Sequence, residues 1–101
     1  MGQKVNLKFI TRRLGEALEE VIRRGWRCPI YVAVIAVSGS MINGRYDYDG
    51  DTDRLKGKVL SQWFDPSSGF KLPINIMLVD SNGQAARVFI KSSDEKPEIL
   101  N

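Results

Sequence analysis

The 101-residue sequence predicts an α+β domain in which one N-terminal amphipathic helix packs on a mostly antiparallel five-stranded sheet, in the order α-β-β-β-β-β. Three observations carry this prediction: apolar residues at helical spacing near the N-terminus, β-branched segments after Pro29, and short turn sequences between those segments. Short connections make successive strands antiparallel neighbours. A chain of this length builds one hydrophobic core, so we expect a single domain over residues 1–93 and a polar C-terminal tail over residues 94–101.

The helix is predicted between Asn6 and Gly25. Its apolar residues recur at steps of three and four, which is the spacing of one helical face: Leu7, Ile10, Leu14, Leu18, Val21 and Ile22. Asn6 is a suitable N-cap, and Gly25 is a suitable residue to end the helix. On the solvent side we expect two i,i+4 ion pairs, Glu19 with Arg23 and Glu20 with Arg24.

Strands are predicted where β-branched and aromatic residues gather between turn signals: Ile30–Val37, Met41–Tyr48, Gly57–Phe64, Ile74–Asp80 and Gln84–Ser92. Residues 38–40 (Ser-Gly-Ser) are expected to form the first hairpin turn and residues 81–83 (Ser-Asn-Gly) the last. Asn43-Gly44 is an alternative first turn, and choosing it would shift the register of the first hairpin.

The first strand is apolar on both faces, because alternate side chains of a strand point to opposite sides of the sheet. A helix is only about 10 Å wide, whereas five strands span roughly 19 Å, so one helix covers one face at most. The other face therefore needs a partner, a ligand or a loop of the chain. We predict a partner interface at Tyr31, Ala33, Ile35, Val37, Met77 and Val79.

Two function classes follow from composition. The formal net charge of +3 permits an anionic partner without requiring one. A local excess of basic residues near the N-terminus makes nucleic-acid binding possible but not favoured, with a candidate anion-binding set of Arg12, Arg13, Arg23, Arg24 and Arg27. The favoured class is a binding or regulatory module that forms a homo-oligomer or binds a protein partner.

The segment Asp47–Asp53 places carboxylates at alternate positions: Asp47, Asp49, Asp51 and Asp53. A calcium loop of the EF-hand type requires Gly at its sixth position and Glu at its twelfth. Counting from Asp47, those positions hold Thr52 and Lys58. We therefore predict a charged loop and no metal site.

No catalytic centre is predicted. The sequence contains no histidine and one cysteine, Cys28, so the usual general base and the usual activator of a thiol are both missing. No cofactor motif is present, and we predict neither enzymatic activity nor a cofactor. The lone cysteine and an N-terminus without the apolar segment of a secretory signal favour a cytoplasmic location, and no apolar run is long enough to predict a membrane span.

Overall fold

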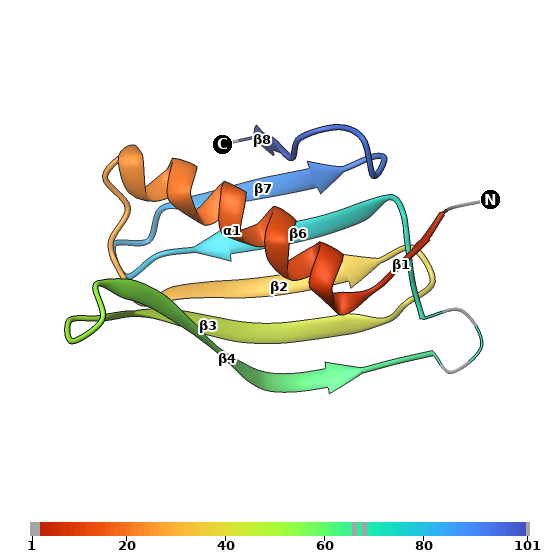
Figure 1. Cartoon of the computed structure of the whole chain (residues 1–101), viewed down its shortest axis with the longest axis horizontal. Coiled ribbons are helices and arrows are strands. Elements are labelled where there is room, and N and C mark those ends of the chain that lie inside the picture. The colour runs from red at the N-terminus through yellow and green to blue at the C-terminus, as the bar shows by residue number, and fades with distance from the viewer. Residues whose placement is uncertain (1–2, 66, 68, 101) are drawn as a thin grey trace.

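The computed structural model describes residues 3–65, 67 and 69–100. Within them it places one helix, α1 (Leu7–Arg23), and eight strands: β1 (Lys4–Val5), β2 (Ile30–Ala36), β3 (Met41–Asp49), β4 (Arg54–Trp63), β5 (Phe70–Lys71), β6 (Ile74–Val79), β7 (Ala85–Ile90) and β8 (Glu98–Leu100). Six strands form one antiparallel sheet in the order β4-β3-β2-β6-β7-β8, and β1 pairs with β5 in a second, two-stranded sheet. Helix α1 crosses one face of the large sheet diagonally (Figure 1).

The α+β class with an antiparallel sheet is confirmed, but the prediction of five strands in one sheet is wrong. The missed strands β1, β5 and β8 are two or three residues long, too short for an alternating pattern to be recognised. Strand β8 lies in the segment 94–101 that we predicted to be a polar tail. There Ile99 pairs with Val88 of β7 and packs against the core, because the edge of the sheet accepts a short strand directly after Pro97.

Both predicted ends of the helix are confirmed. The Asn6 side-chain oxygen accepts a hydrogen bond from the Phe9 amide at 2.9 Å, and Gly25, with φ +96°, follows the last turn in the left-handed region. Arg23 pairs with Glu20 rather than with Glu19. In the part of the chain that is described, no helix is long and apolar enough to cross a membrane.

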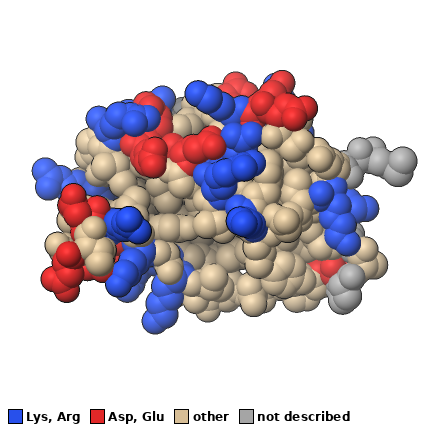
Figure 2. Space-filling view, viewed as in Figure 1, with Lys and Arg blue, Asp and Glu red and all other residues tan. Residues whose placement is uncertain are grey.

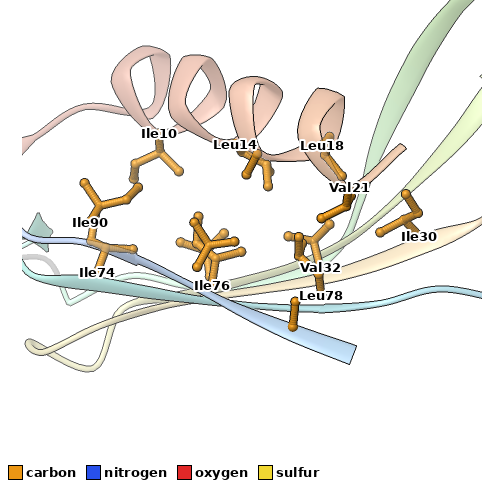
Figure 3. Close-up of a cluster of buried hydrophobic side chains, with 14 of the residues drawn as sticks. Ile10, Leu14, Leu18, Val21, Ile30, Val32, Ile74, Ile76, Leu78 and Ile90 are labelled. Carbon is orange, nitrogen blue, oxygen red and sulfur yellow. The ribbon is translucent and has the colours of Figure 1, made fainter. Parts of the chain in front are cut away.

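The hydrophobic core lies between α1 and the sheet face beneath it (Figure 3). The helix contributes a stripe at steps of three and four residues, and the strands contribute alternate residues, as their two periodicities require. The buried helix residues are Ile10, Leu14, Ala17, Leu18 and Val21. The fully buried strand residues beneath them include Ile30, Ile74, Ile76, Leu78, Val88 and Ile90.

The two predicted hairpin turns are confirmed at residues 37–40 and 80–84. Gly39 and Gly83 adopt φ angles of +97° and +82°, which a residue with a side chain rarely adopts. The alternative turn at Asn43-Gly44 does not form, since both residues lie inside β3. They mark a β-bulge, because the pairing with β4 shifts between these two residues.

Candidate functional site

The sheet face that points away from α1, here called the open face, carries a continuous apolar surface at its centre. We define this apolar patch as Tyr31, Ala33 and Ile35 of β2 together with Met77 and Val79 of β6. The register places Tyr31 beside Val79 and Ala33 beside Met77 across the two central strands of the sheet. Cross-strand neighbours on one face lie about 5 Å apart, so these four side chains form one surface. Ile35 extends it along β2, between Met41 and Asn75 of the two adjacent strands.

The apolar patch is exposed to solvent. Tyr31 is 45% exposed, and Ile35, Met77 and Val79 are each 41% exposed, whereas the alternate residues of β2 and β6 are buried under the helix. The two-sided character predicted for the first strand is thereby confirmed. No described loop folds back over these side chains. They therefore stay exposed in the single chain and are not part of its core.

A side chain from the edge strand extends the patch. Between Asn43 opposite Ser61 and Gly44 opposite Val59, the bulge leaves Leu60 of β4 without a partner directly across the ladder. Leu60 then joins the apolar patch around a shallow hollow of about 220 Å³. The sequence signal for this residue is Asn43-Gly44 inside a strand, which indicates a bulge as well as a turn.

Charged residues lie at the rim of the patch. Arg45 stands opposite Tyr31 in the ladder, and its Nε donates to Asp47 Oδ2 at 2.8 Å. Hydrogen bonding with the Tyr31 side chain, followed by the charge of Asp47, raises the pKa of Arg45. Lys58 and Arg87 occupy the outer strands in register with Arg45 and Met77. The rim thus carries cations, one of which is already neutralised by a carboxylate beside it.

Not every predicted interface residue belongs to the patch, and two exposed residues besides Leu60 were not predicted. Val37 is 73% exposed but lies in the turn after β2, beyond the paired part of the strand. Trp63, 54% exposed, pairs with Met41 at the end of β4, and Leu100, 42% exposed, pairs with Arg87 in β8. Trp63 and Leu100 enlarge the apolar area on the outer strands.

The arginines predicted as an anion-binding set are spread over several surfaces. Arg12 lies over the Phe9 ring, with 5.7 Å between the guanidinium carbon and the ring centroid. Arg13 turns toward the C-terminal segment, where it pairs with Glu16 at 3.1 Å and donates to the Ser93 carbonyl at 2.8 Å. With only 12% of its side chain exposed, Arg13 serves to fix the helix to the loop before β8.

At the other end of the helix, Arg23 and Arg24 share one carboxylate. Both guanidinium groups bond to Glu20, at 2.9 and 3.0 Å, and these bonds, first that of Arg23 and then that of Arg24, lower the pKa of Glu20. Arg27 follows the helix and is exposed. The structure therefore does not bring the predicted basic set together into one cluster.

Of the four aspartates considered as metal ligands, Asp47 and Asp49 lie at the end of β3, and Asp51 and Asp53 lie in the turn after it. Asp49 pairs with Lys56 at 2.7 Å and accepts a hydrogen bond from the Asp51 amide, and these two contacts lower the pKa of Asp49, that of Lys56 more strongly. Asp53 adopts φ 58° in the turn. Among the residues that the structure describes, no three His, Cys, Asp or Glu side chains gather as a metal site would require.

Cys28 is half-buried beside the core. Burial, and secondly the charge of Asp47, raises the pKa of the Cys28 thiol. Both effects keep the thiol protonated near neutral pH, and the protonated form is a poor nucleophile.

Asp80 is a buried carboxylate and organises the hairpin between β6 and β7. Its burial works to raise its pKa, but hydrogen bonds from the amides of Gln84, Arg27 and Asn82 outweigh burial, and the pKa of Asp80 is lowered. An Asp that caps successive amides in this way holds a tight turn in place. Asp80 therefore has a structural role.

Comparison of the chain with protein-family models, with curated protein sequences and with solved structures found no match. The function must therefore be argued from the chain's own surfaces.

Proposed function

We propose that the protein is a non-catalytic binding module that self-associates through the apolar patch of its open face. The observation that supports this proposal is the exposure of Tyr31, Ile35, Met77 and Val79 side by side at the centre of the sheet. Apolar side chains in such a group are costly to leave in water, and on a monomer a contiguous patch of this kind marks an interaction site.

A second copy of the chain is the occupant that fits the dimensions. Six strands about 4.8 Å apart, with about seven residues each at the centre, present roughly 600 Å² of flat area. Because side chains make this surface uneven, its accessible area is larger than its flat area and comes close to the ~800 Å² per partner of a standard interface. Two open faces packed about 10 Å apart would form a sandwich of four layers, with one helix outside each sheet.

The charges at the rim are compatible with this pairing. Arg45 is paired with Asp47, so it brings little uncompensated charge to the interface. Lys58 and Arg87 lie on the outer strands, where their long side chains can bury their methylenes and keep their charged ends in water. The centre of the patch is apolar and its rim is polar, as in protein interfaces generally.

Sedimentation velocity at micromolar concentration tests the proposal. We expect a dimer for the native chain and a monomer for Ile35→Glu, because the variant places an unpaired carboxylate in the centre of the interface. Val59→Glu is the matched control, since Val59 is an exposed strand residue, 56% exposed, that borders the groove on the helix side of the sheet. A monomeric native chain, or an Ile35→Glu variant that remains dimeric, would contradict the proposal.

Nucleic-acid binding stays a prediction, and its basic residues are Arg12, Arg13, Arg23, Arg24 and Arg27. It requires an affinity that falls steeply with salt. Retention on a nucleic-acid column at low salt, lost in a variant with Arg12 and Arg23 changed to Glu, would support that function in place of ours. A cytoplasmic location and the absence of enzymatic activity also stay predictions.

A further inference from the structure

The helix leaves part of its own sheet face uncovered. Helix α1 lies mainly over the central strands, and the long ribbon of β3 and β4 continues past it (Figure 1). Between the helix and this ribbon lies an apolar groove of about 430 Å³. This volume falls in the range of roughly 300–1,000 Å³ typical of small-molecule sites, and it is about three times that of a cavity that holds one benzene.

Two strand glycines lower the floor of the groove, which the Tyr46 ring shares with them. Gly44 and Gly57 both line it. A Cβ atom built on Gly57 would lie 2.7 Å from the Tyr46 ring, and one built on Gly44 would lie 3.0 Å from the Lys58 carbonyl oxygen. Neither position accepts a side chain without a shift of its neighbour, because the Tyr46 ring already lies against Gly57 and the backbone of β4 lies against Gly44.

The walls of the groove are apolar and partly exposed. On the helix side Leu7 is 46% exposed, and on the ribbon side Val59 is 56% exposed, although both face the same hollow. Leu55 of β4 completes the ribbon side. An elongated hydrocarbon lying in the groove would cover side chains that the single chain leaves in water.

The charge beside the groove has one sign. Thr11 lines both the groove and a neighbouring hollow whose wall includes Lys8 and Arg12. No acidic side chain lines either of them among the described residues. Figure 2 shows Lys and Arg side chains on the helix beside an uncharged surface that continues toward the strands. A negatively charged group at this end of the groove would be attracted, and a positively charged group repelled.

We propose that this groove binds an amphiphile with a single hydrocarbon chain and an anionic head group, of the fatty-acid class. The hydrocarbon chain lies over Gly44 and the Tyr46 ring, and the carboxylate lies beside Lys8 and Arg12. This proposal does not rest on self-association, because the groove and the apolar patch are on opposite faces of the sheet.

Titration with monomeric fatty acids, followed by methyl NMR, tests the proposal on the full chain. From octanoate to dodecanoate the affinity is expected to rise about two- to fourfold for each added methylene. The methyl signals of Leu7, Leu55 and Val59 are expected to shift, while those of Ile35 and Met77 stay in place. Shifts at Ile35 and Met77 instead would overturn the proposal, as would the absence of any binding.

A matched pair of variants tests whether the hydrocarbon chain lies in the groove. Thr11→Trp fills the groove from an exposed helix position, and Glu19→Trp adds the same ring on another side of the helix. We expect Thr11→Trp to weaken dodecanoate binding at least about tenfold, the factor that 1.4 kcal/mol represents, and Glu19→Trp to leave it unchanged. Equal affinity in the two folded variants would exclude the groove.

Two further ligands identify the head group and its source. Dodecyltrimethylammonium is expected to bind at least about tenfold more weakly than dodecanoate, which corresponds to 1.4 kcal/mol. Changing Lys8 and Arg12 to Gln should remove this difference. Vesicles of an anionic phospholipid should not retain the protein, since the groove holds one free chain. Equal binding of the cationic amphiphile, or binding to vesicles without binding to dodecanoate, would overturn the assignment.

Discussion

Alanine substitution at two adjacent residues of β6 separates the contribution of the core from that of the apolar patch. Ile76 is 0% exposed beneath α1, and Met77, its neighbour in sequence, is 41% exposed on the open face. Ile76→Ala removes three buried methyl or methylene groups, worth about 0.8 kcal/mol each, and leaves a cavity with a cost of its own. We therefore expect a loss of about 3–4 kcal/mol in the free energy of unfolding, and a fall in Tm of about 12–32 °C.

Met77→Ala should behave differently, and its effect should depend on protein concentration. In dilute solution, where the chain is monomeric, the exposed side chain contributes less than about 1.5 kcal/mol. If the native chain self-associates as proposed, it gains stability from association by mass action at high concentration, and Met77→Ala should lose that gain. Urea denaturation of both variants at two concentrations measures these effects. Equal losses for Ile76→Ala and Met77→Ala, independent of concentration, would refute the assignment of the two faces.

Two further predictions concern local structure. Asn6→Ala removes the oxygen that accepts from the Phe9 amide, and should lower the free energy of unfolding by about 1 kcal/mol in urea; an unchanged midpoint would contradict the capping role. The pKa of Asp80 is lower in the folded chain than in the unfolded chain. Its contribution to the free energy of unfolding is therefore fully present above the unfolded pKa of about 4 and is lost as pH falls through the folded pKa. In acid titrations of stability, Asp80→Asn should therefore lose less stability below about pH 4 than the native chain, and parallel profiles would contradict this.

The central elements of the fold could be predicted because each has a strong periodic pattern. The alternation in Ile30–Ala36 runs through the whole of β2, and the apolar stripe from Leu7 to Val21 is regular over four turns of helix. The same alternation sorts the residues of β2 and β6 onto two faces, which is why the residues of the apolar patch could be named together from sequence.

Other features depend on tertiary structure that no local pattern encodes. Leu60 reaches the apolar patch because of a bulge opposite Asn43-Gly44, and that dipeptide is equally typical of a turn. The groove depends on where the helix crosses the sheet. The sequence therefore places Gly57 in a strand but does not show that Gly57 lines a groove. Ile99 joins the core from a segment that, with Pro97 and several charges, has the composition of a tail.

The register of the central strands sets the order in which the chain can complete its structure. Helix α1 is synthesised before the large sheet, yet the strands that cover its apolar stripe include β6 and β7, at residues 74–90. Strand β2 likewise cannot complete its pairing until β6, its partner along Tyr31–Ala36, has been synthesised. Pairings between segments so distant in sequence slow folding, toward the millisecond-to-second range. A nascent chain that ends before β6 therefore has an exposed helix stripe and a half-paired central strand, the form most in need of a chaperone.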